Sequence, residues 1–270
     1  MAECIVVTSG KGGVGKTTTS ANLAAGLALA GKKVACVDAD IGLRNLDVIL
    51  GLENRIVYDL VQVIEGECRL KQALIRDKRV EGLFLLPAAQ TRDKAAVKPE
   101  DMKRLVADLK EDHDYVIIDC PAGIEQGFKN SIAGADRAII VTTPEVSAIR
   151  DADRIIGLVE AHDLPEPHLI INRYRPHMVS RGDMMNKDDI LEILAIPMIG
   201  MVPDHPDIIV SANRGQPVVF EEKSVVGAAY RRITDRVMGI DVPFPSFETD
   251  PGLWANLKRW MGLAPAREAV

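Results

Sequence analysis

Short apolar runs recur along this chain of 270 residues, and helical patterns separate many of them. Their apolar side chains are consecutive and do not alternate with polar ones, which is typical of a parallel sheet covered by helices on both faces. The runs are residues 5–7, 33–37, 83–86, 115–118, 138–141, 169–171 and 198–202. Helical patterns cover residues 17–30, 99–111, 146–161, 188–194 and 225–238. The alternation predicts an α/β fold with a doubly wound, mostly parallel sheet and helices on both faces.

The composition is that of a folded chain, but its last part differs from the rest. Hydrophobic residues make up 47% and charged residues 27%, which excludes a wholly disordered chain. The alternation continues without a linker to Gly239, so we expect one domain over residues 1–240. Residues 241–251 are proline-rich and non-periodic, which predicts an extended tether, and residues 252–270 form a short tail.

The N-terminus, the cysteines and the net charge narrow the class of protein. The first residues lack a basic region and no apolar run reaches about eighteen residues, so we expect neither a signal peptide nor a membrane-spanning helix. The cysteines (Cys4, Cys36, Cys68 and Cys120) form no C-x-x-C pair, and all but Cys68 adjoin apolar runs. This is typical of small buried residues in a reduced, cytosolic protein. The net charge of −6 disfavours a broadly basic surface, so we expect no specific nucleic-acid partner.

A glycine-rich segment over residues 10–17 fits the pattern G-x-x-x-x-G-K-[ST] between the first strand and the first helix. Glycines let backbone N–H groups converge on an anion, and the helix points its positive end at the same place. Lys16 would reach the β- and γ-phosphates, and the Thr17 hydroxyl would hold Mg²⁺. The residues that we expect to bind the nucleotide here are Lys11, Gly12, Gly13, Val14, Gly15, Lys16, Thr17 and Thr18.

Carboxylates follow two of the predicted strands. Asp38 and Asp40 come after the second apolar run and Asp119 ends the run 115–118, so all would lie at the carboxyl edge of the sheet. We expect Asp38 and Asp119, with Thr17, to hold Mg²⁺ or its waters, because this ion prefers oxygen ligands. The loops 40–47 and 119–125 contain glycine and are candidate switches that respond to a γ-phosphate. Each aspartate could alternatively cap a turn or helix.

The second lysine of the loop, Lys11 in G-K-G-G-V-G-K-T-T, makes the chain resemble the deviant Walker A ATPases. D-x-D-I-G-L-R-N-L-D from Asp38 and D-C-P-A-G-I-E from Asp119 resemble the septum-site-determining branch of that family. Further matches are residues 87–94, 143–147, 149–154 and 180–184, so the resemblance extends from residue 1 to about 239. It implies Mg²⁺-dependent hydrolysis of ATP, an ATP-bound homodimer and regulation of septum placement. The implied protein partners are a MinC-like division inhibitor and a MinE-like activator.

The resemblance also implies roles for individual residues. Lys11 would cross the dimer interface and stabilise transition-state charge in the other subunit, with Lys16 as the second catalytic lysine. Asp40 would orient the attacking water. The alternative for Lys11 is a solvated charge at the edge of the loop.

Adenine and protein partners are assigned through the same resemblance. Asn172, Pro203 and Asp204 match positions that contact adenine, and an amide can both donate to and accept from the edge of the base. Residues 150–154 match a helix that docks partners, and partner binding is assigned to Asp151 and Asp153 of this helix and to Arg44 in the loop 40–47. The alternative for this helix is a solvated face with charge pairs.

Both tryptophans of the chain lie in the C-terminal tail. At helical spacing its side chains divide into an apolar stripe and a basic side: Leu253, Trp254, Leu257, Trp260 and Met261 against Lys258 and Arg259. This pattern predicts an amphipathic helix that lies in the interface of an anionic phospholipid membrane, peripheral on the cytoplasmic face of the inner membrane. Alternatively, the helix packs on its own domain.

Three other functions use the same sequence features differently. A ParA-type partition ATPase would bind DNA non-specifically, which the net charge of −6 and the tryptophan tail disfavour. An iron–sulfur carrier would need clustered cysteines, and Cys120 is the only candidate ligand. A filament subunit without hydrolysis would release no phosphate. The discriminating observations are a salt-sensitive, ATP-dependent shift of plasmid DNA for the partition ATPase, visible absorbance of anaerobically purified protein for the iron–sulfur carrier, and phosphate release that Lys16→Ala loses for the filament subunit.

Overall fold

The computed structural model describes residues 2–244 except 93–95, 163 and 165. Its centre is an eight-stranded sheet in the order β3-β4-β2-β5-β1-β6-β7-β8, in which only the β3–β4 pair is antiparallel. The strands are β1 (Glu3–Thr8), β2 (Val34–Asp38), β3 (Ile75–Arg76), β4 (Leu83–Leu86), β5 (Tyr115–Asp119), β6 (Arg137–Thr142), β7 (His168–Tyr174) and β8 (Met198–Pro203). Each apolar run of the sequence forms a strand, which confirms the predicted parallel α/β sheet.

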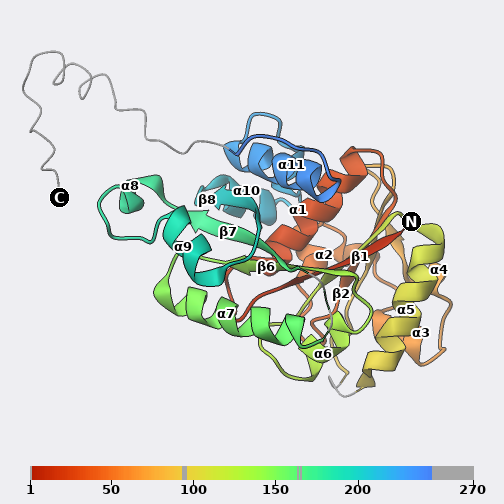
Figure 1. Cartoon of the computed structure of the whole chain (residues 1–270). Helices are drawn as coiled ribbons and strands as arrows, with labels where there is room; N and C mark the ends of the chain where they lie inside the picture. The colour runs from red at the N-terminus through yellow and green to blue at the C-terminus, as the bar shows by residue number, and fades with distance from the viewer. Residues whose placement is uncertain (1, 93–95, 163, 165, 245–270) are drawn as a thin grey trace, which may run out of the picture.

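Helices cover both faces of this sheet (Figure 1). They are α1 (Lys16–Leu29), α2 (Leu46–Ile49), α3 (Leu60–Ile64), α4 (Leu70–Ala73), α5 (Pro99–Asp112), α6 (Gln126–Ile132), α7 (Val146–Glu160), α8 (Pro176–Val179), α9 (Lys187–Leu194), α10 (Asp207–Asn213) and α11 (Val225–Val237). The short 3₁₀ turns η1 (Glu53–Arg55) and η3 (Val218–Phe220) complete the described elements. Helices α1 and α11 pack on one face, while α5, α6 and α7 pack on the other. The predicted helices agree with α1, α5, α7, α9 and α11 to within one residue at each end.

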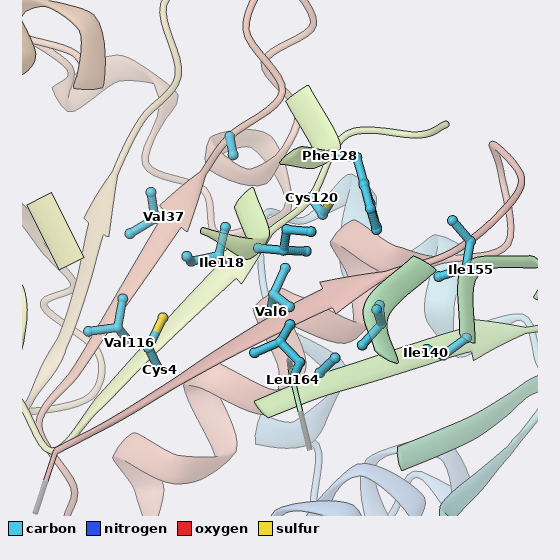
Figure 2. Packing of buried hydrophobic residues seen from close by; sticks show 14 of the residues in the cluster. Cys4, Val6, Val37, Val116, Ile118, Cys120, Phe128, Ile140, Ile155 and Leu164 are labelled. Atoms are coloured by element: carbon cyan, nitrogen blue, oxygen red, sulfur yellow. The ribbon is translucent and has the colours of Figure 1, made fainter. Parts of the chain in front are cut away.

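The core on the α5–α7 face is built around the central strand β1. Figure 2 shows Cys4 and Val6 of this strand among side chains of β2, β5 and β6 and of the helices α6 and α7. Cys4, Cys36 and Cys120 are buried, as their apolar surroundings in the sequence predict, and Cys68 is partly exposed. Because the strands are apolar on both faces, each of the two layers of helices buries its own hydrophobic core.

Strand β1 pairs with β5 on one side and β6 on the other. The chain leaves β1 into α1 on one face of the sheet and leaves β5 into α6 on the opposite face. Ligands of open α/β sheets bind in the crevice outside the carboxyl ends of the strands where the connections diverge in this way. The fold therefore directs attention to the loop after β1 and to the ends of β2 and β5.

Several elements were not predicted from the sequence. Strand β3 has two residues, and α2, α3, α4, α6, α8 and α10 have four to seven, which is too short to show a helical period. Within residues 241–244 there is no helix or strand, and the Arg236 guanidinium lies 3.8 Å from the centroid of the Phe244 ring. The remainder of the predicted tether (241–251) and the whole predicted tail (252–270) lie outside the described residues. No helix of the described part of the chain is long and apolar enough to cross a bilayer.

Candidate functional site

The loop between β1 and α1 lies against two neighbouring elements through glycine. A Cβ atom at Gly10 would overlap the backbone carbonyl of Asp151 on α7. Gly15 adopts φ +100°, and a Cβ atom there would overlap the side-chain amide nitrogen of Asn172. Glycine is therefore required at both positions, because the loop is confined between α7 and the end of β7.

The two lysines of the loop have different surroundings. Lys16 begins α1 and is buried, and its Nζ donates to the Ser9 hydroxyl at 2.9 Å. Lys11 is 45% exposed and its Nζ lies 3.8 Å from a Glu145 carboxylate oxygen and 3.3 Å from the Ser147 hydroxyl. Exposed contacts of this kind contribute little free energy, so Lys11 can exchange them for another partner at low cost.

Two buried carboxylates lie side by side at the ends of β2 and β5. Asp38 and Asp119 are register partners, so their backbones are neighbours across the sheet. Burial raises the pKa of Asp119 to about 6, although hydrogen bonds from Thr17 and from Ser20 (2.9 Å) favour its charged form. Burial and the nearby Asp119 charge raise the pKa of Asp38 to about 8. This pair favours a shared proton or a cation.

The Asp38 carboxylate also holds the backbone that follows β2. One of its oxygens accepts from the Asp40 N–H at 3.0 Å, and the other accepts from Asn45 and Leu46 at 3.4 and 3.3 Å. Asp38 thus performs the capping that the sequence left open as an alternative, while remaining beside Asp119. Asp40 is half-buried in the same loop.

The donor set suits Mg²⁺ better than a softer metal. Thr17, Asp38 and Asp119 offer only oxygen atoms, and two buried carboxylates leave negative charge for a cation to compensate. No group of three or more His, Cys, Asp or Glu that could hold a metal occurs within the described residues. The free cysteines there form no cluster of the kind that an iron–sulfur carrier needs.

A pocket of about 370 Å³ opens beside the loop, at the ends of β7 and β8. It is lined by Gly15, Thr18, Asn172, Arg173, Arg175, Pro203, Asp204, His205, Pro206, Ile208 and Ile209. The structure therefore brings together the three residues assigned to adenine, Asn172, Pro203 and Asp204, and places them next to the loop. An apolar wall with convergent polar groups is typical of a site for a planar base.

Hydrogen bonds fix the polar side chains of this pocket. The Asn172 amide donates to the Val14 carbonyl at 2.8 Å and its oxygen accepts from the Arg173 N–H at 2.9 Å. An amide has two hydrogens and two lone pairs, so each group can take a further partner. Asp204 accepts from Arg175 Nε at 2.6 Å.

The residues assigned to protein partners lie on two elements. Arg44, in the loop after β2, is turned inward: its Nε lies 2.7 Å from the buried Asp47 carboxylate and its side chain is only 16% exposed. Asp151 is half-buried next to the loop glycine Gly10, and Asp153 is exposed on α7. Of the three, Asp153 is the most accessible.

Sequence reasoning missed several residues of this site. Ser9 and Ser20 bond the buried lysine and carboxylate, and Ile208 and Ile209 form the apolar wall of the pocket. Ser9 immediately precedes the glycine-rich motif, and the two isoleucines follow Pro203-Asp204 closely. Their nearness in sequence to residues already assigned to the nucleotide could have identified them as site residues.

Comparisons with known proteins agree with this geometry. An AAA domain family model matches residues 2–164. The septum site-determining protein MinD of Bacillus subtilis is 54% identical over 97% of this chain and 99% of its own length. The MinC:MinD cell division protein complex of Aquifex aeolicus has 48% identity and a TM-score of 0.85 over 90% of this chain and 99% of that one. The MinD of Pyrococcus horikoshii in complex with Mg-ADP has 28% identity and a TM-score of 0.80 over 88% and 96%.

The sheet, the glycine loop with its buried lysine and the paired carboxylates define a P-loop nucleotide-binding ATPase. The high sequence identity to MinD proteins, over nearly the full length of this chain and of theirs, narrows that class. The chain belongs to the MinD family of septum site-determining cell-division ATPases.

Proposed function

We propose that this chain hydrolyses ATP with Mg²⁺ and that the bound nucleotide switches it between a free form and a membrane-bound dimer that regulates septum placement. The observation that carries the proposal is the contrast between the two loop lysines. Lys16 is buried and its charge interacts with the Asp119 carboxylate, whereas Lys11 is exposed and makes only long contacts with Glu145 and Ser147. A phosphate loop that contacts only the nucleotide of its own subunit needs the buried lysine, Lys16, and has no need of a second lysine.

Phosphate binding would use groups that are already in place. Backbone N–H groups of the loop and the start of α1 receive the phosphates, and Lys16 leaves Ser9 to reach the β- and γ-oxygens. Thr17, Asp38 and Asp119 would hold Mg²⁺ and its waters, and the ion when bound neutralises charge on the phosphates. Asp40 would orient the attacking water. Lys11 would then stabilise the transition state across the dimer interface.

Base recognition and partner binding are assigned to neighbouring surfaces. Asn172, Pro203 and Asp204 would contact adenine in the pocket beside the loop. The relative solved as a MinC:MinD complex supports a MinC-like inhibitor as partner of this chain. We assign its docking, and that of a MinE-like activator, to the surface of α7 that carries Asp151 and Asp153, with Arg44 as a further contact once it leaves Asp47.

Membrane attachment is assigned to the tail at 252–270. Its apolar stripe with Trp254 and Trp260 would enter the interface, and Lys258 and Arg259 would meet anionic headgroups at about 1 kcal/mol each. One such tail binds weakly. Two tails joined in a dimer gain avidity on the order of 10²–10⁴, so dimerisation would decide whether the protein is on the membrane.

Sedimentation with anionic phospholipid vesicles tests this proposal. The full chain should sediment with ATP and Mg²⁺, but not with ADP and not when it ends at residue 251. Lys11→Ala is the matched variant: it keeps the tail, Lys16 and the glycines of the loop but lacks the residue assigned to the dimer interface, so it should not sediment with ATP. Equal sedimentation in all four samples would overturn the switch, and a salt-sensitive, ATP-dependent shift of plasmid DNA would favour the partition alternative.

A further inference from the structure

Arg79 lies away from the phosphate loop, in the turn between β3 and β4, and its guanidinium is held in one orientation. It forms a two-point pair with the Asp77 carboxylate, with Nε 3.0 Å from Oδ1 and Nη2 2.5 Å from Oδ2. Asp77 is 1% exposed, and its hydrogen bonds with Arg79 keep its pKa below the usual value despite burial. A two-point pair fixes the plane of the guanidinium as well as its position.

The remaining donors of this guanidinium join the ends of two helices. Nη1 donates to the Gly215 carbonyl at 2.6 Å, just after α10, and Nη2 donates to the Leu50 carbonyl, at the end of α2. The Phe220 ring lies 5.7 Å from the guanidinium carbon. Carbonyls at helix ends lack partners within their helix, so Arg79 supplies a bond that α2 and α10 cannot make themselves.

The two helix ends are also in direct backbone contact. A Cβ atom at Gly51 would lie 2.5 Å from the Gly215 carbonyl oxygen, and one at Gly215 would lie 2.6 Å from the Gly51 Cα. Both glycines adopt φ +61°. Because no side chain separates these backbones, a displacement of one helix end is passed to the other.

The opposite ends of these helices belong to the nucleotide site. The N–H groups of Asn45 and Leu46, at the start of α2, donate to the Asp38 carboxylate. In the first turn of α10, which begins at Asp207, Ile208 and Ile209 line the base pocket. Arg79 therefore connects the carboxylate side of the site to the base side through α2 and α10, without lining the base pocket itself.

We propose that Arg79 is a positioning residue that couples recognition of the base to the placement of Asp38. A base that packs on Ile209 fixes α10, Arg79 transmits that position to α2, and α2 in turn orients the carboxylate that it bonds. A nucleotide with the correct base would thus assemble the metal side of the site, and a bare polyphosphate would not. This inference rests on the proposed function, since it assumes that ATP occupies the pocket and the loop together.

The test compares ATP with tripolyphosphate, which carries the phosphates without a base. In Arg79→Gln of the full chain, we expect the KM for ATP to rise about fivefold, at the low end of typical coupling between sites, and kcat to fall. The Ki of tripolyphosphate as a competitive inhibitor should stay within about twofold, because the phosphate loop is untouched. Arg55→Gln is the matched control: Arg55 donates to the Arg76 carbonyl of the neighbouring β3 at 2.6 Å and should leave all three constants unchanged.

A double mutant separates coupling from loss of structure. Ile209→Ala should lower kcat clearly in the wild-type background but much less beside Arg79→Gln, because the connection to Asp38 is already broken. Additive effects, or equal rises in KM and Ki, would overturn the inference. If Arg79→Gln fails to fold, Arg79→Lys keeps a cation for Asp77 but loses the fork that reaches both carbonyls, and the same expectations apply. A wild-type chain without ATPase activity would instead refute the proposed function.

Discussion

Gly15 offers a sharp test of the site geometry, because one added methyl group acts in two ways. At φ +100° an alanine occupies the left-handed region at a cost of about 1–2 kcal/mol. The new Cβ also overlaps the Asn172 amide, which must leave the Val14 carbonyl, and a buried hydrogen bond of that kind contributes about 1 kcal/mol. Gly15→Ala should therefore lower the free energy of unfolding by about 2–3 kcal/mol.

Urea unfolding without nucleotide measures this loss of stability. Two further variants separate the cost of the backbone conformation from the cost of displacing the Asn172 amide. Gly66→Ala is the control for the backbone term, since Gly66 adopts φ +77° with no heavy atom within 4 Å of an added Cβ. It should cost only about 1–2 kcal/mol. In an Asn172→Ala background, Gly15→Ala should also cost only the backbone term, because the overlap is gone.

The reasoning fails if Gly15→Ala costs the same in both backgrounds, or no more than Gly66→Ala. Either result would mean that Asn172 yields without loss and that the loop is not confined as described. ATP affinity gives a second measurement, because the displaced Asn172 lines the base pocket. Gly15→Ala should weaken ATP binding in calorimetry, whereas Gly66→Ala should not.

Three further predictions concern single groups. Lys16→Ala should abolish phosphate release, since no other buried cation of the described residues lies in the loop; activity near the wild-type level would contradict this. Burial raises the pKa of Asp38 from an ordinary 3.8 to about 8, so the folded state binds more protons than the unfolded state between these values. The unfolding free energy without Mg²⁺ should therefore fall as pH rises from 6 to 8, and Asp38→Asn should flatten this slope; a flat wild-type profile would refute the assignment. Tyr230→Phe removes a hydroxyl that lies 3.3 Å from the Thr19 hydroxyl in the core, and it should lower the unfolding free energy by about 1 kcal/mol in urea titrations; no change would show that this contact contributes nothing.

The sheet was predictable because its strands are apolar on both faces. Residues 115–118 and 138–141 are short, consecutively apolar and rich in β-branched side chains, which favours strands that lie between two layers of helices. The same pattern located the glycine loop and the strand-end aspartates, so the elements of the candidate site could be placed at one edge. That Asp38 and Asp119 are register partners also needed the order of the strands, which periodicity does not contain.

The rest depended on contacts between distant parts of the sequence. Asn172 bonds Val14 across 158 positions and Arg79 bonds Gly215 across 136. Nothing in the residue types selects these partners, because an asparagine or an arginine has many possible acceptors. The helices α2 and α10 were missed for a related reason: four and seven residues form a helix mainly through tertiary packing.

The central place of β1 has a consequence for how the chain is made. Both neighbours of this N-terminal strand come from far downstream, with Glu3 opposite Tyr115 and Ile5 opposite Arg137. At ribosomal rates of roughly 5–20 residues per second, on the order of ten seconds pass between the synthesis of β1 and that of β5, the first of its two neighbouring strands. The phosphate loop cannot close during that time, and an apolar strand stays unpaired. Nascent chains of this protein that end before β5 should therefore bind no nucleotide and depend on chaperones to remain dispersed.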